Sequence, residues 1–152
     1  MSLKEKLQSD LTDAMRSRDE LRSSTIRMVL TAIKNEEVSG KEARELSDSE
    51  IITVLSREAK KRREAAEAFE QAGAKDRAET EKAEGGVIAE YLPKQLSEAE
   101  IKTLISAALQ ETGANTPAQM GLVMKALQPK IAGKADGGMV SSLVKAALTG
   151  GN

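Results

Sequence analysis

The chain has 152 residues, with 23 lysines and arginines against 24 acidic residues, and it contains no cysteine and no histidine. It therefore has no disulfides, no thiolate or imidazole metal ligands and no histidine for proton transfer at neutral pH, which disfavours an autonomous enzyme. Phe69 and Tyr91 are the only aromatic side chains, so single-strand nucleic-acid binding by base stacking is disfavoured as well.

The near balance of charges is typical of a solvated helical surface and not of a uniformly basic nucleic-acid binder. Any RNA contact must therefore be local. The length is enough for one domain or two small ones. No apolar N-terminal stretch is long enough for a signal peptide or a membrane span, so we expect a cytoplasmic protein without a membrane partner.

Four sequence patterns predict the beginning of a helix. Three are capping boxes, in which a serine hydroxyl and a glutamate three residues later satisfy free backbone N–H groups. They begin at Ser2, Ser47 and Ser97. The fourth is Thr116-Pro117, which places a hydroxyl at the N-cap and proline at the first helical position.

Apolar side chains at helical spacing extend these predictions through the first half of the chain. Stripes over residues 3–15 and 26–33 indicate two helices, and a long helix begins after Ser47 and ends near Gly73. A further helix is expected from about Asp76 to Tyr91. Gly85 and Gly86 weaken it and leave room for a kink.

Leu92-Pro93 closes this half, because a residue before proline is disfavoured in the helical region. Three shorter stripes follow over residues 101–108, 120–127 and 139–148, and no stretch alternates at period two long enough for a strand. We predict an all-α protein with an N-terminal bundle of longer helices over residues 1–94. A compact C-terminal three-helix bundle over residues 95–152 completes it.

The first candidate site is the segment of residues 130–140, which contains Gly133, Asp136 and Gly137. The glycines can bend the chain and the aspartate can cap the last helix, but these structural roles leave the lysines unexplained. From residue 121 onward, four lysines stand against one acidic residue, a local net charge of +3. Lysines beside a glycine turn and a helix N-terminus can hold phosphate groups. Two roles of this segment remain equally open: a solvent-exposed turn, or a contact with the phosphates of a nucleic-acid backbone.

The second candidate is a basic run that reaches from Arg57 to Arg63. Four consecutive basic residues at positions 60–63 fan around one helical turn, and Arg62 falls close to the apolar face. Glutamates at positions 58, 64 and 67 are spaced for pairing with them. A salt-bridged exposed face is therefore favoured over nucleic-acid contact, and Lys60, Lys61 and Arg63 stay as secondary RNA-binding candidates.

No nucleotide site, metal site or catalytic residue is predicted, and no cofactor is expected. A P-loop fails because Gln128 and Ala135 stand where that motif requires glycine and a hydroxyl. The glutamates of residues 79–90 form no defined constellation for metal binding or acid–base chemistry. Met120 and Met124 are expected core positions.

The segment from Met120 to Val140 strongly resembles the GatB/YqeY family, although Gly138 stands where larger residues are more usual in the motif. The rest of the chain is similar to the freestanding YqeY-like members, in blocks that cover nearly its whole length: Arg27 to Glu36, Lys61 to Glu64, Phe69 with Ala72-Gly73, and Glu90 to Ser97. The resemblance implies a helical C-terminal half similar to the tail domain of the B subunit of tRNA-dependent amidotransferases.

In those enzymes, which convert misacylated Glu-tRNA or Asp-tRNA to Gln-tRNA or Asn-tRNA with glutamine as the nitrogen donor, the tail domain helps to hold the tRNA. The resemblance therefore implies a non-catalytic tRNA-binding protein, or an accessory of such a carbon–nitrogen ligase. Lys125, Lys130 and Lys134 match basic positions of the tail motif and would be the RNA contacts. Gly121, Gly133, Asp136 and Gly137 would shape the loop that carries them.

A rival interpretation is a helical protein–protein adaptor without RNA binding. The lysines would then serve solubility, and the binding surface would be an exposed apolar strip on the N-terminal helices. The tRNA-binding interpretation does not require aromatic side chains for base stacking, because folded RNA can be recognised through phosphates and 2′-hydroxyls. Because the positive charge of the C-terminal segment is small, we expect its binding to RNA to be weak and strongly dependent on salt.

Overall fold

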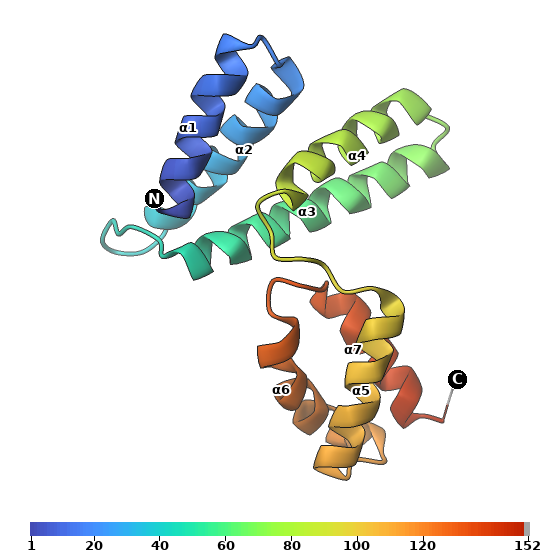
Figure 1. The fold of residues 1–152 in the computed structure, drawn as a ribbon. Coiled ribbons are helices and arrows are strands. Elements are labelled where there is room, and N and C mark those ends of the chain that lie inside the picture. Colours follow the sequence, from blue (N-terminus) through green and yellow to red (C-terminus); the bar gives the residue numbers. More distant parts are fainter. Residues whose placement is uncertain (151–152) are drawn as a thin grey trace. The chain divides into compact units, whose positions relative to one another are not determined.

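The computed structural model describes residues 1–150, which contain helices and no strand, so the predicted all-α class is confirmed (Figure 1). The elements in chain order are α1 Leu3–Arg16, α2 Glu20–Glu37, α3 Asp48–Gln71, α4 Lys75–Ala89, α5 Glu98–Thr112, the 3₁₀ turn η1 Pro117–Gln119, α6 Met120–Ile131 and α7 Gly137–Leu148. None of the described helices is long and apolar enough to cross a bilayer. The chain divides into two compact units, the first over Met1–Leu92 and the second from Pro93 onward.

The three predicted capping boxes form in the structure. At the start of α1, for example, the Glu5 N–H donates to Ser2 Oγ at 3.2 Å, and the Ser2 N–H donates to Glu5 Oε2 at 2.9 Å. Equivalent pairs begin α3 and α5. The fourth start differs, because η1 precedes α6 and the α-helix begins only at Met120. There the Gln119 side-chain oxygen accepts from the Thr116 N–H at 3.2 Å, which holds the turn tight.

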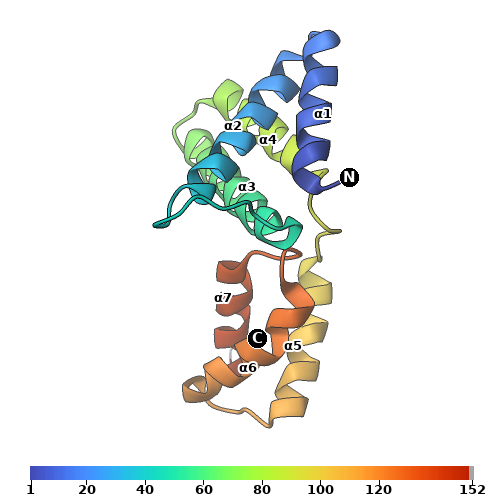
Figure 2. The same ribbon diagram turned by 90° about the vertical axis from the view of Figure 1, so that its left-hand side faces the viewer.

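In the first unit, α1 and α2 form one antiparallel pair, and α3 and α4 form another (Figures 1 and 2). The turn between α3 and α4 contains Gly73 at φ 78°, a left-handed conformation that favours glycine. α4 runs through Gly85 and Gly86 without a break. Packing against α3 offsets the weak helix propensity of the two glycines, and a Cβ on Gly85 would lie 3.7 Å from Arg62 Cβ.

One apolar core holds the first unit together, and it draws buried side chains from all four helices and the connection before α3: Leu7, Ile26, Val29, Ile33, Leu46, Ile51, Val54, Leu55, Val87, Ile88 and Tyr91. Tyr91, two residues beyond the end of α4, is tied to α1, since its hydroxyl donates to Asp10 Oδ2 at 2.6 Å. Burial and the bonded Asp10 carboxylate raise the pKa of Tyr91. The same hydrogen bond lowers the pKa of Asp10.

The second unit has its own core, which consists of Ile101, Ile105, Ala108, Ala114, Val123, Leu127, Ile131, Val140, Val144 and Leu148. The segment before α5 is tied to the turn between α6 and α7. Leu96 N–H donates to the Lys134 carbonyl at 2.9 Å, and Gln95 Nε2 donates to the Gly133 carbonyl at 2.8 Å. The turn at Gly133 therefore has a structural role within this unit.

Candidate functional site

The lysines of the second unit are its most distinctive charged groups. From Pro93 onward the sequence has six lysines and four acidic residues, a net charge of +2, whereas the first 92 residues carry 17 basic and 20 acidic residues, a net charge of −3. Lys125, Lys130, Lys134 and Lys145 are all exposed. Within residues 1–150, none of these four amines forms an ion pair, whereas Lys102 of the same unit pairs with Glu98 at 3.4 Å.

The three lysines proposed as RNA contacts lie on α6 and on the turn that follows it. Lys125 and Lys130 are five residues apart, so they are separated by about 7.5 Å along the helix axis and by about 140° around it. Between them lies an exposed stripe that contains Leu122 and Pro129. The lysines therefore bracket a surface and do not point at one spot.

Two of the four loop-shaping candidates have a local role in the backbone. Gly133 has φ 73°, and Asp136 caps α7 by accepting from the Gly138 N–H at 3.2 Å. Gly121 and Gly137 lie inside the first turns of α6 and α7 with φ outside the left-handed region, and a Cβ on either would meet open space. The backbone of the described residues gives no reason for glycine at these two positions.

The basic run of α3 is engaged with glutamates over much of its length. Lys61 Nζ lies 3.2 Å from Glu58 Oε1, and Lys60 Nζ lies 4.0 Å from Glu64 Oε1. Arg63 is exposed, and it too has an interaction partner. Lys60, Lys61 and Arg63 are therefore less available to an anionic ligand than the lysines of α6.

Arg62 turns toward α4, as its place near the apolar face predicted. Its Nη1 lies 3.1 Å from Glu81 Oε2 and 3.6 Å from Glu84 Oε2, and its Nε is buried without a hydrogen-bond partner. All three side chains retain between 15% and 21% of their exposure. Burial raises the pKa of Glu84, and the neighbouring Glu81 charge raises it further, while Arg62 acts in the opposite direction.

We expect Glu84→Gln to stabilise the protein slightly at neutral pH. Because the folded state raises the pKa of Glu84, it binds the proton more tightly than the unfolded chain, and stability falls as the pH rises through the folded pKa. The amide removes this loss, so the gain should disappear at a pH low enough to protonate Glu84. Urea unfolding at pH 4 and pH 7 measures it, with the exposed Glu79→Gln as the control; a less stable Glu84→Gln variant at pH 7 would contradict the prediction.

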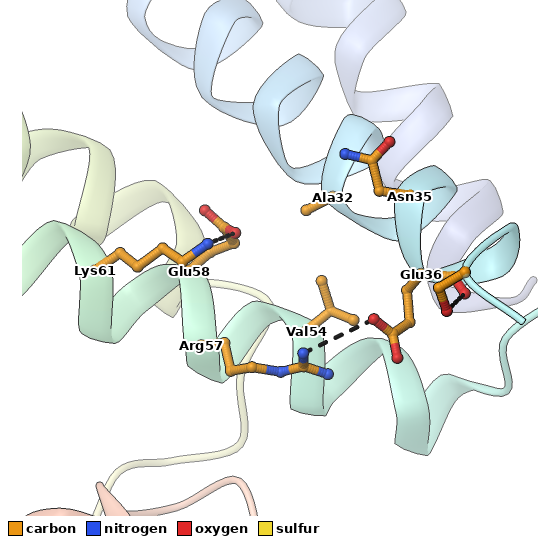
Figure 3. Close-up of a pocket in the computed structure, with 8 residues that line it drawn as sticks. Ala32, Asn35, Glu36, Val54, Arg57, Glu58 and Lys61 are labelled. Carbon is orange, nitrogen blue, oxygen red and sulfur yellow. Dashed lines mark hydrogen bonds and ion pairs between the residues drawn. The ribbon is translucent and has the colours of Figure 1, made fainter.

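A hollow of about 360 Å³ lies between α2 and α3 in the first unit (Figure 3). We call it the α2–α3 hollow. Two ion pairs flank it: Lys61 with Glu58, and Arg57 Nη1 with Glu36 Oε2 at 3.8 Å. Ala32 and Val54 face each other across the gap between these pairs (Figure 3).

Glu58 is the unusual member of this hollow, because a carboxylate at a position only 7% exposed is rare unless it is well paired. From the sequence, Glu58 is expected only to pair with nearby basic residues. Its spacing from Val54 and Leu55 was the available signal, since residues three and four apart share a helix face. Asn35 and Ser39, which also line the hollow, gave no signal of their own.

Comparisons with known proteins give one matching family model and two relatives. The family model described as Yqey-like protein matches residues 4–148. A protein of Clavispora lusitaniae is 32% identical over 129 residues, which are 83% of this chain and 74% of the relative. A protein of Lachancea thermotolerans is 31% identical over 147 residues, or 93% of this chain and 76% of the relative. Both relatives are named "Altered inheritance of mitochondria protein 41, mitochondrial".

These names correct the cytoplasmic location expected from the sequence, because both relatives are named as mitochondrial proteins. The expectation rested on the absence of an apolar signal peptide or membrane span. That absence does not distinguish the cytoplasm from the interior of an organelle, since mitochondrial transit peptides are amphipathic and not apolar.

Proposed function

Since this chain belongs to the YqeY-like protein family, as its sequence predicted, we propose that it is a non-catalytic helical protein that binds tRNA or assists a tRNA-dependent amidotransferase. The relatives' names mention neither activity, so this proposal depends on the residues of the chain itself. Lys125, Lys130 and Lys134 of the second unit are its RNA contacts.

The exposed lysines without ion pairs carry this proposal. A lysine already paired with a carboxylate must lose that partner to bind a phosphate, whereas these three amines have no such partner within the described residues. Phosphate contacts release counterions from the nucleic acid, which provides affinity without sequence-specific contacts. Lys125 and Lys130 lie on either side of an exposed stripe of α6. This spacing suits an RNA backbone that crosses the helix surface better than it suits a single bound phosphate ion.

The adaptor interpretation has less support. An adaptor would need exposed apolar side chains that lie next to one another on the N-terminal helices. The exposed side chains Leu21 and Val38 instead lie at opposite ends of α2. Seventeen positions at helical rise separate them by about 25 Å. Met15 lies near the Leu21 end only.

Changing Lys125, Lys130 and Lys134 together to alanine should reduce tRNA binding by about tenfold or more at low salt. Loss of three phosphate contacts should also flatten the slope of log affinity against log salt by roughly 2 to 3. A filter-binding titration of folded tRNA over a salt series measures both quantities. The matched control is Lys34, Lys41 and Lys75 changed to alanine, which removes the same charge from exposed positions of the first unit.

Equal weakening by both triple variants would mean that only net charge matters, and it would contradict the proposed site. Failure of the wild type to bind tRNA more tightly than another polyanion, such as heparin, would contradict the proposed function and favour the adaptor. An amidotransferase accessory is tested by the same variants in a pull-down with purified amidotransferase.

A further inference from the structure

The α2–α3 hollow is lined by equal numbers of positively and negatively charged side chains. Glu36 and Glu58 provide two carboxylates, while Arg57 and Lys61 provide two cations. A purely anionic or purely cationic ligand would find as much repulsion as attraction there. A ligand with one charge of each sign avoids this cost, because each of its charges can meet an opposite one.

We propose that the α2–α3 hollow binds a free α-amino acid with a small aliphatic side chain. Its ammonium group lies against Glu58, its carboxylate against Arg57 and Lys61, and its side chain against Ala32 and Val54. This site lies in the first unit and does not depend on RNA binding by the second.

Glu58 is the strongest reason for the ammonium position. Its side chain retains 9% of its exposure, and its hydrogen-bond partner is the Lys61 amine at 3.2 Å. An ionised carboxylate can accept about four hydrogen bonds, so a single lysine leaves most of its acceptor capacity unused. Lys61 itself is 62% exposed, and the cost of moving such a side chain to a new partner is small.

The two cations are placed to share one carboxylate. Arg57 and Lys61 are four residues apart on α3, so they lie on the same side of the helix. The present partner of Arg57 is Glu36 at 3.8 Å, which is beyond the distance of a good charge-assisted hydrogen bond. A ligand carboxylate that approaches Arg57 to about 2.8 Å would improve on this contact.

The apolar and polar remainder of the hollow limits the ligand's size. Ala32 and Val54 provide a small apolar surface between the ion pairs (Figure 3). A volume of about 360 Å³ is ample for a free amino acid, and the small apolar surface of Ala32 and Val54 favours a short aliphatic side chain over a large one. Asn35 lines the same space, and its amide bonds to no described residue, so it can orient the ligand.

Titration of the full chain with L-valine, followed by amide NMR shifts, tests the proposal. The expected result is a saturable shift of residues 32–39 and 54–61 with a dissociation constant of about 1 mM or lower. L-Valinamide lacks the carboxylate and N-acetyl-L-valine lacks the ammonium, so each should bind at least tenfold more weakly. No saturable shift, or equal binding of valine and valinamide, would overturn the proposal.

Variants test the assignment of each charge. Glu58→Gln keeps the shape of the side chain and should weaken valine binding at least tenfold. Lys61→Ala should weaken valine binding severalfold; because this change also removes the partner of Glu58, a dispersed amide spectrum of the variant without ligand must show that it folds. The matched control is Glu67→Gln, an exposed carboxylate on the same helix, which should bind valine like the wild type. A control variant that loses as much affinity as Glu58→Gln would also overturn the proposal.

Discussion

Replacing Leu127 with alanine should unfold the second unit while the first unit stays folded. Leu127 is fully buried in the core of α5, α6 and α7, and a Leu→Ala change at such a position costs about 2–5 kcal/mol. A core of this size rarely supplies more than about 3–5 kcal/mol of stability. The measurement is an amide NMR spectrum of the full chain, in which dispersed signals from residues 1–92 persist and those of the second unit collapse.

The matched control for this prediction is Leu122→Ala on the same helix. Leu122 is 53% exposed, so the same chemical change there should alter stability by less than about 0.5 kcal/mol. If the Leu127→Ala variant instead lost the signals of both units together, the two halves would not be independent. That result would contradict our proposal that residues 1–94 and 95–152 are separate domains.

The unfolded second unit should also lose tRNA binding, if the proposed function is right. Lys125 and Lys130 would no longer be held on a helix, although the net charge of the chain is unchanged. Retained binding would show that charge alone attracts the RNA. Leu122→Ala lies within the stripe between the two lysines and tests whether that apolar surface contributes.

Replacing Arg62 with methionine should destabilise the first unit by about 2 kcal/mol at neutral pH. The change leaves Glu81 and Glu84 half-buried beside α3 without their shared cation. Breaking a fully buried pair costs about 3–5 kcal/mol, and we expect less here because all three side chains keep some contact with solvent. Urea unfolding of the two proteins at pH 7 measures the difference.

This loss should shrink as the pH falls toward the range in which carboxyl groups bind protons. Glu84 already has a raised pKa in the presence of Arg62, and removal of the cation raises it further, so the protonated pair tolerates methionine. Arg63→Met, one position along the same helix and exposed, is the control and should change stability little. An equal loss at pH 4 and pH 7 would indicate that Arg62 acts through packing and not through charge.

The predicted helix starts and the actual ones agree best where the signal is local. Ser2, Ser47 and Ser97 begin helices because a capping box needs only residues three positions apart. The prediction was less accurate where packing competes with local preference. α4 continues through Gly85 and Gly86 because α3 supports it, and α6 begins later than Thr116-Pro117 suggested.

The candidate sites show the same division. The sequence identified the lysines of α6, since their charge excess is a property of composition, but it could not place them on opposite sides of an exposed stripe. It also placed Arg62 near the apolar face by counting along one helix. The partners Glu81 and Glu84 are 19 and 22 positions further along, so only the α3–α4 contact reveals them.

By itself, therefore, the sequence determined the all-α class, the capped starts of α1, α3 and α5, and the YqeY-like family, because caps, helical periodicity and motif blocks are carried by residues close together in the chain. Only the tertiary structure decided which charges stay unpaired, which carboxylates become buried, and that a hollow opens between α2 and α3. These properties depend on side chains from separate helices, and a helix's own sequence does not specify which face of another helix will cover it.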